Sequence, residues 1–301
     1  MFRPTRGAPV PQPRIALVTT AHLPEGAVDQ DLPLLRDAVA AAGGEAAVVN
    51  WDDPEVDWAG FDLALIRSTW DYTWRTGKFL AWAERCAAAT TLLNPPAVVR
   101  WNADKRYLGE LATLGVPTVA TVYLPPGGGT DGLPGEHEFV VKPAAGAGAR
   151  YAARYRPGRH EEARAHVERM HGEGITAMVQ PYMPRIDTTG ERALVYVDGR
   201  FLHAIAKNAV LAPDTRYDER KVAHPGVRPW IPTEAELATA EQALAAVPGR
   251  PRLLYARVDL VDAEDGTPRV MELELIEPQL FLTEHPDSLP VIADAVLRAV
   301  G

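Results

Sequence analysis

The stretch 253–278, LLYARVDLVDAEDGTPRVMELELIEP, constrains the fold of this chain more than any other. We call it the acidic hairpin, because residues 253–261 and 268–275 predict two apolar strands and the turn-forming run 262–266 joins them. Three carboxylates interrupt the apolar pattern, namely Asp259, Glu272 and Glu274. Residues two apart on a strand share a face, so the two glutamates point the same way, and pairing of the strands brings the aspartate near them.

Clustered carboxylates repel one another unless a cation lies between them, and hard oxygen ligands of this kind suit Mg²⁺. Mg²⁺ usually shares one or two protein carboxylates with nucleotide phosphates. One interpretation of the acidic hairpin is therefore a Mg–ATP site on the wall of a sheet. The other is a solvated hairpin face whose acids point outward for solubility. The hairpin alone favours the second interpretation, and the rest of the chain favours the first.

Composition excludes several classes of protein. A chain of 301 residues has room for two or three domains, and its formal net charge of −9 argues against a general binder of nucleic acid or anionic membranes. The single cysteine, Cys86, excludes an internal disulfide and a cysteine-based zinc site. No uninterrupted apolar run approaches membrane-spanning length, and residues 1–13 lack the apolar core of a secretion signal. We expect a cytoplasmic protein with a flexible lead-in.

The N-terminal third alternates strands and helices, which implies parallel pairing and a doubly wound α/β domain. The predicted strands are 14–20, 45–49 and 63–66, and the predicted helices are 29–42 and 78–89. The domain ends near 94–96. In such sheets, ligands bind beyond the C-terminal ends of the strands. The segment there that carries the most chemistry consists of Arg67, Ser68, Thr69, Trp70, Asp71 and Tyr72.

This segment offers the groups that a small zwitterionic substrate needs. Arg67 suits a carboxylate, Asp71 suits an ammonium group, and the aromatic rings of Trp70 and Tyr72 exclude water. The alternative is that the two rings cover the edge of the domain and that Asp71 caps a turn. The residues alone leave both interpretations open.

In the middle of the chain, a strand beginning at 139 delivers Lys142 into a loop that contains Gly146 and Gly148. The glycines permit close approach of phosphates and the lysine supplies a point charge, although a simple hairpin turn explains the pattern equally well. The strand 176–180 runs into Gln180-Pro-Tyr-Met183, which suits the edge of an adenine ring or plain core. Further elements are predicted as helices at 102–114, 160–172, 232–247 and 286–300, and as a strand at 118–124.

A second hairpin is predicted at 193–197 and 200–206 around Asp198-Gly199. Arg192 precedes it and Lys207 follows it. The loop 211–230 then carries Arg216, Arg220, Lys221, His224 and Arg228. Such a basic run is usually a solvated surface, but next to a triphosphate it suits a lid that screens charge.

This succession of elements resembles the ATP-grasp superfamily, in its branch similar to glutathione synthetase. The resemblance implies an ATP-grasp fold (α+β in the ATP-grasp part) with an N-terminal doubly wound pre-ATP-grasp domain. The implied domains are 1–96, a central ATP-grasp subdomain at 97–183, and a C-terminal subdomain at 184–301 that carries the acidic hairpin. It also implies ATP and Mg²⁺ as cofactors, a small amino-acid-like substrate, no nucleic-acid or membrane partner, and a homo-oligomer.

The resemblance assigns roles at the matching positions. The implied Mg²⁺ ligands are Asp259, Glu272 and Glu274. Lys105 and Lys142 match the lysines that contact ATP phosphates and the adenine pocket, and Gly146 and Gly148 belong to the phosphate loop. Gln180, Tyr182 and Met183 would line the adenine site, and Asp187 lies near where the family contacts ribose. Arg192, Lys207 and Arg257 would neutralise phosphate charge. Two departures stand out: the loop 144–150 has less glycine than the family pattern, and Glu274 replaces an asparagine, which leaves open that only Asp259 and Glu272 bind metal directly.

Two segments, IRSTWDY and MELELIEPQLF, are similar to the cyclo-ligases that close the ring in D-cycloserine biosynthesis. This resemblance implies activation of a carboxylate as an acyl phosphate and cyclisation of O-ureido-D-serine to D-cycloserine, with release of ADP, phosphate, CO₂ and ammonia. The alternatives are an intermolecular dipeptide or γ-glutamyl ligase of the same fold and a non-catalytic nucleotide-binding protein.

Overall fold

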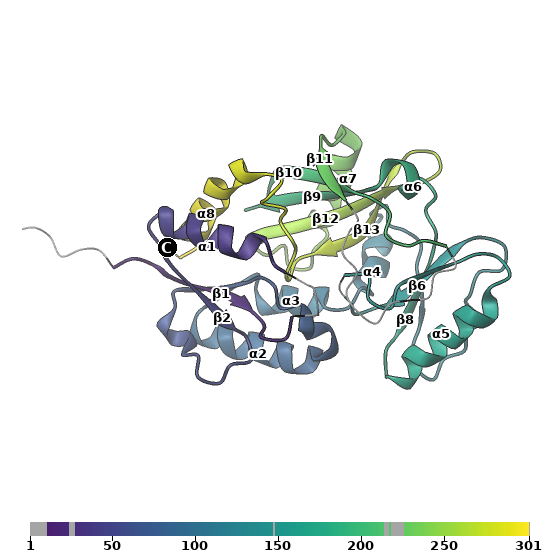
Figure 1. Cartoon of the computed structure of the whole chain (residues 1–301), viewed down its shortest axis with the longest axis horizontal. Coiled ribbons are helices and arrows are strands. Elements are labelled where there is room, and N and C mark those ends of the chain that lie inside the picture. The colour runs from purple at the N-terminus through teal and green to yellow at the C-terminus, as the bar shows by residue number, and fades with distance from the viewer. Residues whose placement is uncertain (1–10, 24–27, 147, 214–216, 218–225, 301) are drawn as a thin grey trace, which may run out of the picture.

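The computed structural model describes residues 11–23, 28–146, 148–213, 217 and 226–300 and arranges them around three sheets (Figure 1). The sheets follow one another along the chain. Each buries an apolar face beneath its own helices, and a cavity lies where the three parts meet. Within these residues, no helix is both long and apolar enough to cross a lipid bilayer.

The first sheet is parallel, with the order β2-β1-β3-β4. Its strands are β1 (Arg14–Thr19), β2 (Glu45–Asn50), β3 (Leu63–Ile66) and β4 (Thr91–Leu93). Side chains alternate between two cores: one face packs on α2 (Thr76–Ala89), and the other packs on α1 (Asp31–Ala41) and α8 (Leu289–Arg298). Helices on both faces of a parallel sheet confirm the predicted doubly wound arrangement. The last helix of the chain thus returns to the first domain (Figure 1).

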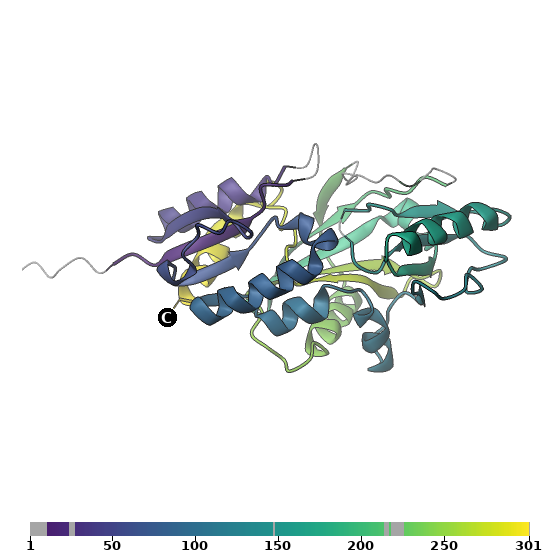
Figure 2. The same cartoon turned by 90° about the horizontal axis from the view of Figure 1, so that it is seen from below.

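The second sheet is antiparallel, with the order β5-β8-β6-β7, and one face packs on α5 (His160–Gly172). Its strands are β5 (Val122–Leu124), β6 (Phe139–Pro143), β7 (Ala153–Tyr155) and β8 (Ala177–Pro181). In the view from below, this sheet and α5 form the end of the molecule opposite the first sheet (Figure 2). The phosphate-loop segment follows β6.

The third sheet has the order β11-β10-β9-β12-β13 and carries the acidic hairpin as its last two strands. Its strands are β9 (Glu191–Val197), β10 (Arg200–Lys207), β11 (Val227–Trp230), β12 (Tyr255–Asp262) and β13 (Pro268–Glu274). One face packs on α4 (Tyr107–Thr113) and α7 (Glu234–Ala245). The helix α7 begins with a reciprocal capping box between Thr233 and Glu236, which satisfies two backbone N–H groups at its start.

Shorter elements link these layers. They are α3 (Pro96–Asn102), α6 (Ile186–Thr189) and the 3₁₀ turns η1 (Trp58–Gly60), η2 (Trp70–Trp74) and η3 (Pro286–Ser288). The segments β4, β7, β11, α3 and α6 escape the sequence patterns, since three to seven residues are too few to display a period.

Two predicted elements are wrong in their extent. The helix predicted at 102–114 is divided, because α3 ends at Asn102 and α4 begins at Tyr107. Between them, the backbone N–H of Lys105 donates to Ala144 O at 2.7 Å, outside any helical ladder. The strand predicted at 118–124 is reduced to β5, because Thr118 forms an isolated bridge beside Val270 instead of continuing that strand.

Candidate active site

A cavity of about 830 Å³ is lined by residues from all three sheets and their loops. The turn η2, which follows β3 of the first sheet, contributes Trp70 and Tyr72; the second sheet contributes Lys142, and the third contributes Lys207 and Asp259. Most residues that the sequence assigned to a site therefore converge on one space. The cavity is large enough to hold a nucleotide together with a small substrate.

The register of the acidic hairpin places its carboxylates on the cavity wall. Asp259 lies directly opposite Glu272, and Arg257 lies opposite Glu274. A bulge shifts the register just after Asp259, so that Leu260 pairs with Val270. All three acids line the cavity. This agrees with the prediction that the period of two puts Glu272 and Glu274 on one face and that hairpin pairing brings Asp259 near them.

Two cations hold Asp259 in its ionised form. Arg257 donates from Nε and Nη2 to its two oxygens, both at 2.8 Å, and Lys207 Nζ lies 2.7 Å from Oδ2. Burial alone raises the pKa of a carboxyl group, but here Arg257 and Lys207 outweigh burial and hold the pKa of Asp259 well below its usual range. Lys207 also pairs with Glu191, a cavity-lining acid that the sequence analysis missed. Burial raises the pKa of Glu191 to about 7 despite that pairing.

Glu272 and Glu274 each contact one cation through Oε1. Lys105 Nζ lies 3.1 Å from Glu272, and Arg257 Nη2 pairs with Glu274. Burial raises the pKa of Glu274 to about 7, with Arg257 opposing it and the charges of Asp259 and Glu272 adding to it. The two glutamate side chains remain 22% and 26% exposed, towards the cavity.

This donor set fits Mg²⁺ in the form that the ion usually takes beside a nucleotide. Within the described residues, no three His, Cys, Asp or Glu side chains are already arranged as a complete metal cage. Asp259 is turned towards its two cations, while the glutamates face the cavity. One or two carboxylates plus phosphate oxygens therefore suit this wall better than coordination by protein alone.

Buried side chains from outside the third sheet bind the backbone of β13, the second strand of the acidic hairpin, and of the residue that follows it. Asn102 Nδ2 donates to Leu273 O at 2.7 Å, and Leu275 N donates to Asn102 Oδ1 at 2.9 Å. The hydroxyl of Tyr107 both donates to Leu273 O and accepts from Leu273 N, each at 2.9 Å. Asn94 likewise donates to the carbonyl of Leu275 at 2.7 Å. Sequence reasoning missed these residues, because an asparagine near a helix end is more simply interpreted as a cap.

The phosphate-binding candidates all line the cavity. Lys142, Gly146 and Gly148 line it, and Lys105 Nζ donates to Gly146 O at 2.5 Å. Burial lowers the pKa of Lys142, partly opposed by the charge of Glu272. Two lysines beside two cavity-lining glycines form a suitable environment for phosphates.

The adenine candidates line the same cavity. Gln180, Tyr182 and Met183 line the cavity, and Gln180 Nε2 donates to Thr121 Oγ1 at 2.9 Å. Asp187 does not line the cavity, since its carboxylate accepts from Tyr182 OH at 2.5 Å and pairs with an arginine, Arg154, at 3.3 Å. In this structure Asp187 therefore contacts the wall residue Tyr182 without reaching the cavity itself.

The segment after β3 divides into wall and support. Trp70 and Tyr72 line the cavity and are 7% and 5% exposed. Asp71 is fully buried away from it, bound by Trp51 Nε1 at 2.9 Å and Arg75 Nη1 at 2.8 Å. The carboxylate of Asp71 is thus already paired with a cation inside the protein.

The remaining members of that segment lie behind the wall. Ser68 Oγ is hydrogen bonded to Thr19 Oγ1 at 2.8 Å, and Thr69 is fully buried. Arg67 Nη2 donates to Pro278 O at 2.8 Å, and the guanidinium carbon of Arg67 lies over the ring of Tyr255, 5.5 Å from its centroid. Arg67 therefore ties the first domain to the segment that follows the acidic hairpin.

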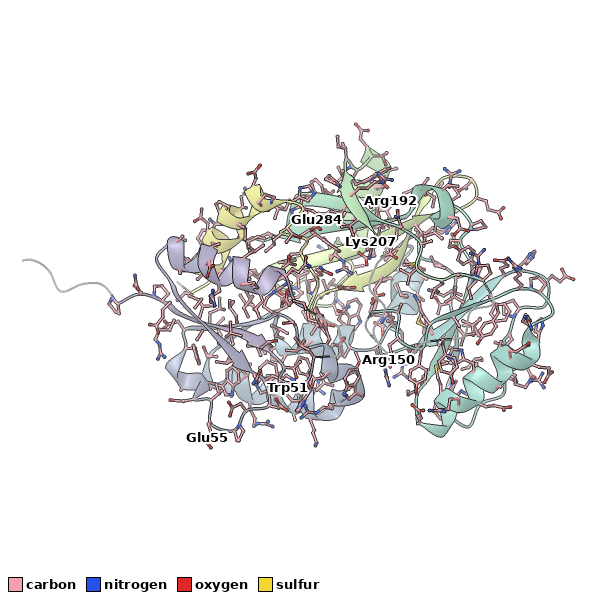
Figure 3. The ribbon with its side chains drawn as sticks, viewed as in Figure 1. Trp51, Glu55, Arg150, Arg192, Lys207 and Glu284 are labelled. Atoms are coloured by element: carbon pink, nitrogen blue, oxygen red, sulfur yellow. The ribbon has the colours of Figure 1, made fainter. Side chains whose placement is uncertain are left out.

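Arg192 is not brought to the cavity. It neighbours Glu191 on β9, and successive strand residues point to opposite faces. Its guanidinium, 1% exposed, pairs with Glu236 at 2.8 Å and with Asp262. Figure 3 shows Arg192 and Lys207 on the third sheet.

The predicted lid lies mostly outside the described residues, among them Arg216, Arg220, Lys221 and His224. Arg228 is described, and its guanidinium lies 5.0 Å from the ring centroid of Trp230. It does not line the cavity.

Two comparisons by sequence place this chain among known proteins. Residues 15–94 match the family model of the N-terminal domain of the D-cycloserine synthetase DcsG. The chain is 38% identical over 297 residues to the cycloserine biosynthesis protein DcsG of Streptomyces lavendulae, covering 94% of this chain and 97% of that protein.

Solved structures show the same fold. A crystal structure of D-cycloserine synthetase DcsG matches with a TM-score of 0.86 and 37% identity, over 96% of this chain and 100% of that one. A D-alanine–D-alanine ligase from Bacillus anthracis complexed with ATP matches at 0.64 and 15% identity, over 95% and 97% of the two chains. The ATP-grasp ligase PsnB, complexed with a minimal precursor, Mg and ADP, matches at 0.60 and 18% identity, over 95% and 98%. The chain therefore belongs to the DcsG family and is an enzyme with the fold of the ATP-grasp ligases.

Proposed function

We propose that this ligase cyclises O-ureido-D-serine to D-cycloserine, with conversion of ATP to ADP and phosphate and release of CO₂ and ammonia. The observation that carries the proposal is the 38% identity to DcsG across nearly the whole of both chains. The cavity supports it, because acidic, basic and aromatic side chains from all three parts of the molecule line one space.

Carboxylate activation requires charge neutralisation more than covalent help from the protein. Lys105 and Lys142 line the cavity and are our candidates for contacts with the phosphates of ATP, and Lys207 and Arg257 pair with Asp259 of the acidic hairpin. Glu272 and Glu274, which face the cavity, would hold Mg²⁺ together with phosphate oxygens, and Asp259 stands beside them on the same wall. When bound, the ion stabilises the charge on phosphoryl oxygens. Arg257 and Lys207 keep Asp259 ionised, and they are placed to neutralise the substrate's carboxylate as it attacks the γ-phosphorus.

Ring closure then needs little beyond orientation. The substrate nitrogen bonded to the side-chain oxygen forms a bond to the activated carbonyl carbon, gives up its proton, and the C–O bond to phosphate breaks. The product of this step is a five-membered isoxazolidinone that still carries the carbamoyl group on nitrogen. One water then hydrolyses that group to CO₂ and ammonia. Intramolecular attack gains a large effective molarity, so the enzyme has only to hold the folded rotamer.

An acyl phosphate is lost if water reaches it first. Trp70 and Tyr72 place two nearly buried rings on the cavity wall, and Phe281 adds a third on the opposite segment. We assign these rings to the exclusion of water around the intermediate.

The proposal is tested by ADP release from the purified enzyme with Mg–ATP and O-ureido-D-serine as the only amino-acid substrate. We expect ADP and D-cycloserine in equal amounts, identified by mass spectrometry. ADP release that requires a second amino acid, with a linear dipeptide as product, would instead establish an intermolecular ligase.

A further inference from the structure

The cavity presents one carboxylate that the acidic wall does not use. Six acidic side chains line it: Glu191, Asp259, Glu272, Glu274, Glu277 and Glu284. The first four pair with lysine or arginine as described above, and Glu277 also interacts with another group. Within the described part of the chain, Glu284 has no cationic partner, and its carboxylate accepts only from Thr283 Oγ1, at 2.6 Å.

Glu284 stands on a rigid turn. The backbone N–H groups of Glu284 and His285 both donate to Phe281 O, at 3.2 and 3.1 Å. The ring of His285 stacks on His203 of β10, with centroids 4.3 Å apart and planes 14° apart. His203 in turn bonds Leu280 O through Nε2 at 2.7 Å.

A buried carboxylate fixes the start of the same turn. Asp31, fully buried at the first residue of α1, accepts from the backbone N–H groups of Leu280, Phe281 and Leu282 at 2.6, 3.1 and 2.8 Å. Phe281 adopts a φ of +55°, a conformation that a bulky residue rarely takes without such support. Two independent anchors therefore hold Glu284 at its place on the cavity wall.

The turn adjoins the end of the cavity where a carboxylate would be activated. Arg257 lies 5.4 Å from the ring centroid of Phe281 and donates to Gln279 O at 3.1 Å. Figure 3 shows Glu284 and Lys207 on the same part of the molecule, and both line the cavity. In an α-amino acid the ammonium group is bonded to the carbon next to the carboxyl group, so its recognition site must lie beside this end.

We propose that Glu284 binds the α-ammonium group of the amino-acid substrate and so selects α-amino acids. This inference rests on the proposed function, because it takes the substrate carboxylate to be the group that is activated. Asp71, the candidate that the sequence suggested for this role, is enclosed by Arg75 and Trp51 and faces away from the cavity. An ammonium–carboxylate contact gives both binding energy and orientation.

The test compares two substrates in wild-type enzyme and in Glu284→Gln. The first substrate is O-ureido-D-serine, and the second is its deamino analogue, 3-(ureidooxy)propanoic acid. For the full substrate we expect Glu284→Gln to lower kcat/KM by roughly 10- to 100-fold, mainly through KM. For the analogue, which lacks the ammonium group, the same substitution should have little effect, and Glu284→Asp should retain part of the wild-type selectivity.

Asp287→Asn is the matched control, because Asp287 is an exposed acid on the same segment that does not line the cavity. It should leave both substrates unaffected. Equal losses on the two substrates in Glu284→Gln, or no loss on either, would overturn the assignment of Glu284 alone. Absence of ADP release by the wild-type enzyme with O-ureido-D-serine would overturn the proposed function, and the assignment with it.

Discussion

The substitution Asn102→Leu tests whether one buried amide sets the position of the acidic strand. The asparagine accepts from Leu275 N and donates to Leu273 O, a carbonyl that Tyr107 OH also reaches. A leucine of similar shape would leave the N–H of Leu275 without a partner and remove a second bond. An orphaned buried donor together with one lost bond costs about 2–4 kcal/mol. Because Leu273 lies between Glu272 and Glu274, we expect ADP release to fall as well.

The size of the thermal shift follows from the length of the chain. An unfolding entropy of about 2.1 cal/mol/K per residue over 301 residues converts this loss into a decrease in Tm of about 3–6 °C. Differential scanning calorimetry without ligands measures it. Gln242→Leu is the control, since that exposed amide donates to Gly115 O at 3.1 Å. A Tm for Asn102→Leu no lower than that of the control would refute the reasoning.

Three further predictions concern the backbone, pH and the aromatic wall. Gly190→Ala should lower both Tm and turnover, because Gly190 has φ +78° and an added Cβ would lie 2.5 Å from Lys207 O. Gly249→Ala is the control, because Gly249 has φ +74° but open space around it, so this variant has the backbone strain without the clash. Equal losses of Tm in the two variants would contradict a role for the clash. Burial lowers the pKa of His203 to about 4 in the folded protein, whereas the unfolded value is near 6.5. Protonation of His203 therefore favours the unfolded state between these two values. The free energy of unfolding should be unaffected by this group above pH 6.5 and should fall by roughly 3 kcal/mol as the pH decreases to 4. In urea unfolding at pH 7.5 and 4.5, His203→Gln should therefore lose less stability than wild type, and parallel losses would argue against this. Asp71→Asn should weaken the ion pair with Arg75 that holds the turn η2, which carries Trp70 and Tyr72. We expect KM for the amino-acid substrate to rise roughly tenfold and KM for ATP to stay nearly unchanged. Equal changes of both KM values in steady-state kinetics would argue against a role of Asp71 in positioning these two rings.

The sequence was sufficient for the parts of the site that depend on local periodicity. The alternation of strand residues placed Glu272 and Glu274 on one face, and hairpin pairing put Asp259 beside them. Helix α5 (His160–Gly172) and strand β3 (Leu63–Ile66) have the bounds that their patterns predicted. In these cases the signal lies within one element.

The remainder depends on contacts between elements far apart in the chain. Glu191 and Arg192 are neighbours of opposite charge, and only the packing of β9 decides which of them faces the cavity. Asp71 and Glu284 are both acids near the end of a secondary-structure element, yet buried partners occupy the first and leave the second available. A sequence pattern carries no information about which partners will be within reach.

The most direct test of the central claim, that the acidic hairpin is the Mg–ATP site, is a Mg²⁺ titration of ADP release by wild-type enzyme and Glu272→Gln. Glu272 is a half-buried cavity residue whose replacement keeps its shape and removes its charge, so the fold should survive. The account predicts that the variant retains the wild-type Tm and has little turnover, most clearly at limiting Mg²⁺. Near-normal turnover of Glu272→Gln at limiting Mg²⁺ would contradict it.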